Sequence, residues 1–394
     1  MTNLQNLLNE LCPNGVEYKT LGEIATDIYR GSGITRNQVT ESGTPCVRYG
    51  EIYTTYGIWF DHCVSYTNAE QISNRKYFEY GDILFAITGE SVDEIAKSCA
   101  YIGHEQCLAG GDIVVLKHEQ DPKYLSYALA TTSAQAQKSR GKVKSKVVHS
   151  SVPAIKEICV PVPPLEVQQE IVRILDHFTA LTAELNDKLT AELTARKKQY
   201  AYYRDELFRT AKDADIYFLN EISENCDNQR KPVTSGNRIA GEYPYYGASG
   251  IVDYVDDYIF DGDYLLISED GANLLARSTP IAFSISGKNW VNNHAHVLRF
   301  DTYETRRYIE IYLNSIDLSP YITGGAQPKL NQKNLNKIPI PLPSPDEQRR
   351  IVSILDRFDA LCNDLTSGLP AEIEARKKQY EYYRDKLLAF KELR

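Results

Sequence analysis

The chain has 394 residues, of which 42% are hydrophobic and 25% charged, a composition typical of a soluble globular protein with two or three domains. It contains no apolar run of about 18 residues and no basic, apolar leader, so we expect neither a membrane span nor a secretory signal. The formal net charge of −9 counts against a simple DNA-binding protein, although binding depends on where the charges lie.

The first domain is predicted over residues 1–157. GDILF (81–85) and GGDIVVL (110–116) are short apolar runs that follow turn residues, which is typical of buried strands. Near its end, QKSRGKVKSK (137–146) places five basic residues within nine positions and contains no acidic residue. Such a segment suits contact with DNA phosphates, although a solvated surface loop explains the composition equally well.

A proline-rich connector and a long helix are predicted over residues 158–212. VPVPPLEVQQ (160–169) reads as an extended connector, because proline fixes φ and lacks an N–H. From Ile171 to Leu207, apolar residues then recur every three or four positions, which is the spacing of a helix seam. A helix of about 40 residues is about 60 Å long and needs a partner to cover this seam.

The second domain, residues 213–337, repeats elements of the first. GEYPYYG (241–247) resembles GTPCVRYG (43–50), GDYLL (262–266) matches GDILF, and NNHAHVL (292–298) lies where GGDIVVL lies. LNEI likewise resembles LGEI near the start of each domain. The domain ends in GGAQPKLNQKNLNK (324–337), whose place before a proline exit matches that of the basic segment.

Residues 338–394 repeat the connector and the helix. Residues 338–390 align with 158–210 without a gap, at a constant offset of 180, and about half of the positions are identical. Gly368 and Pro370 depart from the helical pattern, and because the alignment stays gapless we expect a kink in a continuous helix. The two similar helices are the obvious partners for each other. Periodicity alone fits a dimerising coiled coil in an unrelated protein about as well.

No catalytic motif is found in the sequence. DPKY (121–124) lacks the second proline of the adenine-methyltransferase motif and is typical of a helix start. No Gly-x-Gly loop is placed to bind S-adenosylmethionine. GK at 141–142 and at 287–288 lacks the earlier glycine of a P-loop. His294 and His296 share a strand face, but structural or DNA-contacting roles are favoured over metal binding. The eight scattered cysteines form no Cys-x-x-Cys pair, so we expect reduced thiols in a cytoplasm and no zinc site.

Candidates for DNA contact come from the basic segments and from loops after predicted strands. Arginine and lysine can contact phosphates or read guanine, and asparagine and glutamine can read adenine. Each residue taken alone is more simply explained as scaffold or surface. In the first domain the candidates are Arg30, Thr35, Arg36, Arg48, Tyr49, Glu51, Lys138, Arg140, Lys142, Lys144 and Lys146. In the second they are Tyr246, Ser249, Asn273, Arg277, Lys288, Asn292, Asn293, His294, Gln327, Lys329, Asn331, Gln332 and Lys333.

Several of these segments together resemble the specificity subunits of type I restriction-modification enzymes. The resemblance lies in LLNELCPNGVEYKTLGEI (7–24), the two proline exits with the helix starts that follow them, the ARKKQY-x-YYRD-x-L helices, and YPYYGASG (243–250) with NNHAHVL. It covers essentially the whole chain. The duplicated helix text is highly specific to this family, whereas the domain text is less so.

The resemblance implies an α+β fold, in which two similar mixed α/β target-recognition domains are separated by two long antiparallel helices that form a coiled coil, with a pseudo-two-fold internal duplication. Each domain would read one half of an interrupted site in double-stranded DNA. The helices would set the spacing and dock two methyltransferase (modification) subunits. The residues expected in this spacer and docking role are Phe178, Leu181, Leu185, Leu189, Arg196, Tyr200, Tyr203, Phe358, Leu361, Arg376, Tyr380 and Tyr383.

The resemblance also implies a non-catalytic, cytoplasmic chain without a cofactor of its own. The modification subunits would bind S-adenosylmethionine and methylate adenine, and separate restriction (motor) subunits would use ATP and Mg to translocate and cut DNA. Two other classes stay open. A protein-only coiled-coil scaffold would lack sequence-specific DNA binding, and an autonomous methyltransferase or nuclease would act as the purified chain alone.

The central helix contains a candidate ruler. Some members of the family carry repeated Thr-Ala-Glu-Leu units there, and this chain has TAEL (182–185), NDKL (186–189) and TAEL (190–193). Four residues turn a helix by about 40° and lengthen it by ~6 Å, while one base pair turns DNA by roughly 35°. Adding one unit is therefore expected to change the gap between half-sites by about one base pair.

Overall fold

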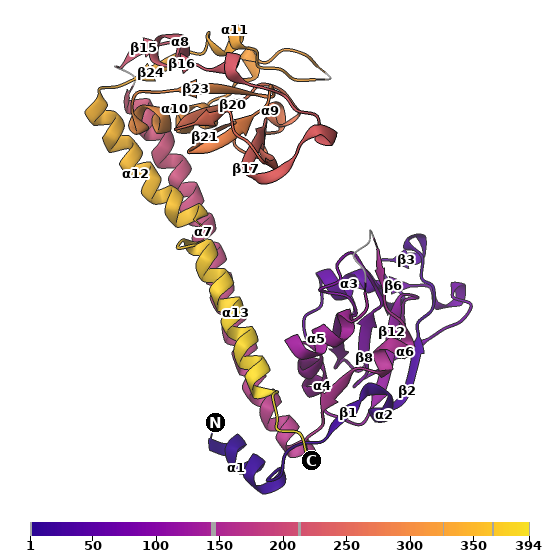
Figure 1. Cartoon of the computed structure of the whole chain (residues 1–394). Helices are drawn as coiled ribbons and strands as arrows, with labels where there is room; N and C mark the ends of the chain where they lie inside the picture. Colours follow the sequence, from indigo (N-terminus) through magenta and orange to yellow (C-terminus); the bar gives the residue numbers. More distant parts are fainter. Residues whose placement is uncertain (1, 143–146, 212–213, 326, 365, 394) are drawn as a thin grey trace. The chain divides into compact units, whose positions relative to one another are not determined.

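A computed structural model of the chain describes residues 2–142, 147–211, 214–325, 327–364 and 366–393 (Figure 1). The chain divides into two compact units. The first is Met1–Lys188 with Ile373–Arg394, and the second is Leu189–Glu372. Each unit holds one mixed domain with parts of the long helices, and the predicted boundary at residues 212 and 213 lies outside the described residues.

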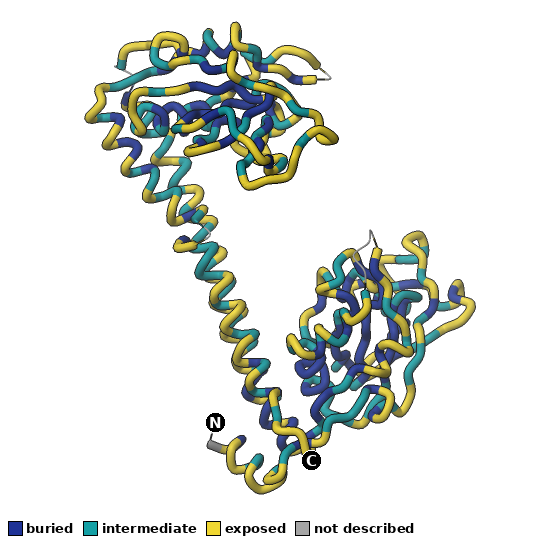
Figure 2. Tube along the Cα trace, in the orientation of Figure 1, coloured by how far each residue is buried: buried dark blue, intermediate teal, exposed yellow. Residues whose placement is uncertain are grey.

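Two five-stranded sheets form the first domain. In the order of hydrogen-bonded neighbours, one contains β2 (Ala25–Arg30), β12 (Ile113–His118), β8 (Ile83–Ala86), β10 (Ser98–Tyr101) and β5 (Trp59–Phe60). The other contains β3 (Val39–Thr40), β6 (Ser65–Thr67), β4 (Thr44–Val47), β11 (Cys107–Ala109) and β7 (Tyr77–Phe78). Every residue of β8 is buried, as its unbroken apolar run predicts. Figure 2 shows the buried residues gathered along these strands.

Short helices and strand pairs complete the first domain. They are α1 (Thr2–Leu11), α2 (Leu21–Ile24), α3 (Tyr49–Thr54), α4 (Pro122–Leu129), α5 (Thr132–Ser139), α6 (Val152–Lys156), the pair β1 (Tyr18–Thr20) with β14 (Cys159–Pro161), and the pair β9 (Thr88–Gly89) with β13 (Val148–His149). DPKY starts a helix as predicted: Asp121 accepts a hydrogen bond from the Tyr124 amide, 2.9 Å away, and Pro122 fits the first turn because no intrahelical N–H is needed there.

The second domain has the same strand order in two four-stranded sheets. One contains β16 (Glu224–Asn225), β23 (Ala295–Arg299), β20 (Tyr264–Ser268) and β21 (Ala282–Ile285). The other contains β18 (Gly250–Val255), β17 (Ala240–Gly247), β22 (Lys288–Val291) and β19 (Phe260–Asp261). Among the described residues, the second sheet of each domain has one parallel strand pair, β4 with β11 and β17 with β22. The duplication therefore extends through both domains.

The remaining elements of the second domain are α8 (Leu219–Ile222), α9 (Asn273–Ala276), α10 (Tyr303–Ser315), α11 (Gln332–Leu335), and the pair β15 (Asp215–Tyr217) with β24 (Ile340–Leu342). The first long helix, α7, runs without interruption over Leu165–Thr210. In the second unit it meets α12 (Pro345–Asn363), where the Tyr203 and Phe358 rings are 5.7 Å apart and Lys197 lies near Cys362. Because the partner number falls as the α7 number rises, the two helices are antiparallel.

The prediction of one kinked C-terminal helix is wrong, because the second copy is interrupted between α12 and α13 (Leu369–Leu387). A Cβ atom at Gly368 would lie 2.6 Å from the carbonyl oxygen of Ala360, so the turn between the helices requires glycine here. Asp364 accepts hydrogen bonds from the amide and hydroxyl of Thr366, which compete with helical pairing. Pro370 fits the first turn of α13, where no N–H is needed.

Candidate nucleic-acid interface

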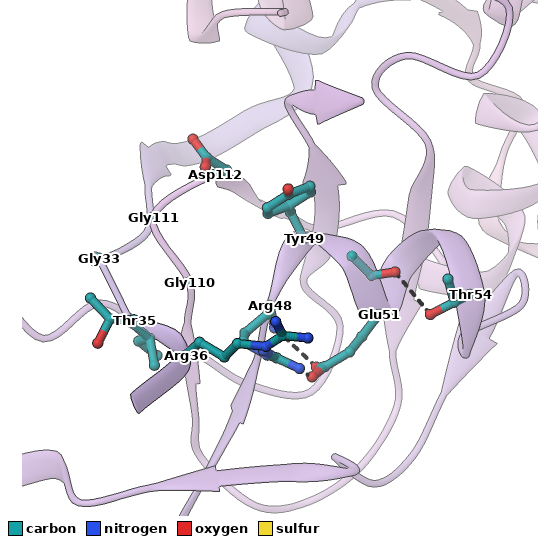
Figure 3. A pocket seen from close by; sticks show the side chains of 12 residues that line it. Gly33, Thr35, Arg36, Arg48, Tyr49, Glu51, Thr54, Gly110, Gly111 and Asp112 are labelled. Carbon is teal, nitrogen blue, oxygen red and sulfur yellow. Dashed lines mark hydrogen bonds and ion pairs between the residues drawn. The ribbon is translucent and has the colours of Figure 1, made fainter. Parts of the chain in front are cut away.

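A cleft of about 540 Å³ opens in the first domain where the parallel strands β4 and β11 end (Figure 3). The two strands are joined there by the Gly110 amide, which donates to the Val47 carbonyl at 2.8 Å. Loops after both strands line the cleft, and the segment after β2 closes another side. The predicted candidates Thr35, Arg36, Arg48, Tyr49 and Glu51 all lie in its lining.

Glu51 holds Arg48 at this cleft. Its carboxylate accepts from Arg48 Nε at 3.1 Å and from the Arg48 amide at 3.0 Å, while the Ser65 hydroxyl donates to it at 2.6 Å. Glu51 is buried, and no other partner of the Arg48 guanidinium is found among the described residues. A guanidinium fixed through Nε can present its two terminal nitrogens as the fork that reads guanine or grips phosphate.

The other candidates give the cleft exposed polar and aromatic surface. Arg36 is exposed, and its guanidinium lies on the same side of the cleft as the Arg48 guanidinium and the Glu51 carboxylate (Figure 3). Tyr49 is 39% exposed, so its ring face and hydroxyl are accessible. Arg30 lies at the rim, where it pairs with Asp112 at 2.6 Å and with the Gly111 carbonyl. The cleft therefore combines two arginines that are each paired with a carboxylate, Arg30 and Arg48, with the exposed Arg36.

The basic segment differs from the prediction at its first residue. Lys138 is only 4% exposed, and its Nζ donates to the Leu129 carbonyl at 2.8 Å and to the Ser98 hydroxyl at 3.2 Å. It is therefore a core residue and is removed from the DNA-contact candidates. Arg140 is exposed and Lys142 is half-buried, so both stay candidates. Lys144 and Lys146 lie outside the described residues.

The second domain presents an equivalent strand end. The Asn292 amide after β22 donates to the Tyr246 carbonyl on β17 at 3.1 Å, as Gly110 does to Val47. His294 follows, with Nδ1 2.9 Å from the Asp270 carboxylate. Asp270 forms a β-bridge with Lys329, so the NNHAHVL motif and the 324–337 segment meet at one place. The sequence predicted both segments but not their proximity.

Of the remaining candidates at this strand end, Ser249, Asn293, Gln327, Gln332 and Lys333 are exposed. Asn292 is buried, and its side-chain oxygen accepts from the His294 amide at 2.8 Å, so it supports the loop instead of presenting its amide to DNA. Asn331 accepts from the Asn334 amide at 3.0 Å and thereby caps α11. These two candidates are corrected to structural roles.

Three further candidates make contacts within the domain. Lys288 begins β22, at the opposite end of the strand from Asn292, and its Nζ lies 4.6 Å from the Tyr258 ring centroid. Asn273 accepts from the Thr279 amide at 3.0 Å and braces the turn after α9. Arg277 is half-buried, donates to the Ile316 carbonyl, and has its pKa lowered by burial. Asn273 and Arg277 are therefore corrected to structural roles.

Sequence reasoning missed the acidic residues of both strand ends. Asp112 pairs with Arg30, and Asp270 pairs with His294. The alignment of GGDIVVL with NNHAHVL contained a signal for the first, because it places Asp112 opposite His294. Among the described residues no cluster of histidine, cysteine and carboxylate groups could hold a metal ion. His296, the other histidine of the motif, is buried and bonded to protein groups instead.

The helices carry the expected spacer residues on a partly uncovered seam. In the first unit a groove of about 240 Å³ is lined by Phe178, Leu181, Leu185, Tyr380 and Tyr383, with Arg376 beside them. Beyond Leu175 no residue of α7 is buried. Leu189, Arg196 and Tyr200 lie further along α7, and Leu361 lies on α12. No helix among the described residues is long and apolar enough to cross a membrane.

A family model described as the type I restriction modification DNA specificity domain matches residues 13–195 and 211–375. The chain belongs to this family. The predicted resemblance and the predicted α+β duplication are thereby confirmed. Members are specificity subunits, in agreement with the prediction of a non-catalytic chain.

A putative type I restriction enzyme specificity subunit of Haemophilus influenzae is 41% identical over 179 residues, which are 44% of this chain and 46% of that protein. A type I restriction enzyme specificity subunit of Escherichia coli is 38% identical over 265 residues, 60% of this chain and 63% of that protein. The match thus spans less than two thirds of either relative. One solved structure, which concerns complex assembly and conformational transition of the type I system, contains a chain with the same fold at TM-score 0.66 and 19% identity, covering 95% of this chain and 98% of that one.

Proposed function

We propose that the chain is the DNA-recognition subunit of a type I restriction-modification complex, and that each domain reads one half of an interrupted site in double-stranded DNA. The observation that carries the proposal is the repeated strand end. In both domains it lies beside the central parallel strand pair and presents arginine, histidine or amide groups. Two copies of one scaffold with different exposed groups suit the reading of two different half-sites.

The formal charge of −9 fits this proposal if affinity is completed by partners that close around the duplex. We propose that two modification subunits dock on the helices, one on each copy, through the partly uncovered seam that includes the Phe178 groove. These subunits would bring S-adenosylmethionine and adenine methylation, and restriction subunits would bring ATP, Mg and DNA cleavage. The assembled complex would act in the cytoplasm.

Methylation mapping in cells that express the chain with its cognate modification subunit tests the proposal. The expected result is one interrupted motif with methylated adenine in each half. A continuous motif, or a motif read by one domain only, would contradict it. The purified chain alone should neither bind S-adenosylmethionine nor cleave DNA, which separates it from an autonomous enzyme. A protein-only scaffold would give no motif even with the partner present.

We further propose that residues 182–193 set the gap between the half-sites. This segment lies wholly within α7, so four added residues extend a regular helix by one turn and ~6 Å. Insertion of one TAEL unit is expected to change the gap by about one base pair and leave both half-sites unchanged. Replacement of NDKL by TAEL keeps the length and serves as the control. An unchanged gap in the insertion variant would refute the ruler.

A further inference from the structure

His296 in the second domain is bonded at both ring nitrogens to acceptor groups. It lies on β23 and is 1% exposed. Nδ1 is 2.6 Å from a carboxylate oxygen of Asp227, and Nε2 is 2.8 Å from the carbonyl oxygen of Leu330. The Leu330 carbonyl oxygen can only accept a hydrogen bond, so Nε2 carries a proton and donates to it.

A network of charged side chains surrounds this histidine. Asp227 also accepts from the Val297 amide at 2.8 Å, and Arg230 lies 3.3 Å from Asp227 and 2.7 Å from Glu269. Burial would raise the pKa of Asp227, but the hydrogen bond and charge of His296 outweigh it and lower this pKa below its ordinary value. Replacing such a network by apolar side chains often costs no stability, so its presence suggests a role in fixing one arrangement.

The network ends on the segment that carries the exposed candidates. The Leu330 carbonyl accepts from His296, and the Leu330 amide donates to the Glu269 carbonyl at 2.8 Å. Lys329 reaches the Glu269 carboxylate at 3.2 Å, while its own side chain stays half exposed. The carbonyl and the amide of Leu330 are thus both hydrogen-bonded to the residues of the sheet side, His296 and Glu269. The residues near Leu330 in the sequence include the exposed Gln327, Lys329, Gln332 and Lys333.

The first domain has no such histidine. GGDIVVL places Val114 where NNHAHVL places His296, four residues after the amide that links the two strands. Val114 is buried and belongs to an apolar core cluster. The two domains therefore share a strand position but not its chemistry, which makes the network a feature of the second domain.

We infer that His296 is a positioning residue for DNA recognition by the second domain, and that its two hydrogen bonds hold the 327–333 segment in the conformation that reads a half-site. The inference rests on the proposed function. His296 itself stays inside the domain and acts through Leu330. Loss of the His296 donor to the buried Leu330 carbonyl is expected to loosen the segment and reduce base discrimination by about tenfold.

The test uses the full chain assembled with its cognate modification subunit and measures methylation of duplexes with single base-pair changes in either half-site. His296→Gln keeps one donor, and His296→Val installs the residue of the first domain. His296→Val is expected to reduce discrimination about tenfold in the half read by the second domain, and His296→Gln to reduce it by less because its amide can still donate to Leu330. Both should leave the other half unchanged. Arg48→Gln identifies the half read by the first domain. Lys337→Gln, an exposed charge change just outside the segment, is the matched control.

A spectroscopic measurement on the wild type keeps the inference testable if a variant fails to fold. In protein labelled with 15N-histidine, Nε2 of His296 is expected to carry the proton that it donates to Leu330, and the corresponding signal should disappear in His296→Gln. A His296 without a proton on Nε2, or equal loss of discrimination in both halves, would overturn the inference while leaving the proposed function intact. If the wild type shows no bipartite preference at all, the proposed function fails and the inference fails with it.

Discussion

Lys138 is a buried lysine without an acidic partner among the described residues, and replacing it by methionine is expected to stabilise the first unit. Its Nζ has two neutral acceptors, the Leu129 carbonyl and the Ser98 hydroxyl. Burial, reinforced by the charge of Arg384, lowers the pKa of Lys138 to about 7. Methionine has a similar length and no charge to desolvate, so it fits the same space.

The magnitude follows from the displaced pKa. The pKa of Lys138 in the folded chain lies about 3.5 units (10.5 minus 7) below its ordinary value, and each pKa unit corresponds to about 1.4 kcal/mol. Between pH 7 and 10.5 the unfolded chain binds more protons, so the stability of wild type rises with pH across this window, and the full penalty of about 5 kcal/mol applies below pH 7. Loss of two hydrogen bonds costs about 1–3 kcal/mol. Lys138→Met is therefore expected to gain about 2–4 kcal/mol at pH 6.

Urea unfolding followed by tryptophan fluorescence checks this. The chain has two tryptophans, and in a Trp290→Phe background only Trp59 of the first domain reports. Wild type should become more stable between pH 7 and 10, whereas Lys138→Met should show a flatter profile. Arg140→Gln, which changes an exposed charge two residues away, should behave as wild type. A destabilised Lys138→Met at pH 6, or a flat wild-type profile, would refute the reasoning.

Three further changes test other parts of the molecule. Burial lowers the pKa of His118 to about 4, so on acidification the unfolded chain takes up the proton before the folded chain does. The free energy of unfolding of the first unit should therefore fall by up to about 3 kcal/mol between pH 6.5 and 4. Acid titration should show a smaller fall in His118→Gln. Arg307 pairs with three carboxylates, each within 2.7 Å. Arg307→Leu should destabilise the second unit by about 2 kcal/mol in urea unfolding, because the carboxylates lose their cation. An unchanged unfolding midpoint would argue against the pairing. Gly368→Ala should cost about 1–3 kcal/mol in urea unfolding because its Cβ would collide with backbone oxygens, while Gly236→Ala, with open space around it, should be neutral.

The duplication and the correspondence of strands between the domains could be predicted because they depend on patterns that repeat along the chain. GDILF and GGDIVVL become β8 and β12, and their counterparts become β20 and β23 in the same order. The cleft was predictable in part for the same reason, since polar residues that follow a buried strand must lie at its end. Arg48 and Tyr49 follow β4, and the structure places both in the cleft lining.

Side-chain burial could not be predicted where a short helix decides it. Lys138 and Ala134 are one turn apart on α5 and both face the core, but alanine alone gives too weak an apolar signal to reveal that face. The break before α13 was missed for a related reason. A gapless alignment records the number of residues, and it does not distinguish a kink from a turn that Gly368 makes at close approach to backbone oxygens.

His296 shows why the two domains can differ in chemistry while keeping one scaffold. A change from valine to histidine at the buried position of Val114 would leave an imidazole without partners, which costs several kcal/mol. The second domain avoids this cost because Asp227 comes from the segment after β16 and Leu330 from the segment before α11. Its histidine, carboxylate and held segment therefore form one set. Grafting only residues 327–333 onto the first domain would transfer the exposed side chains without the groups that hold them, so exchange of recognition between such domains requires the exchange of whole cores.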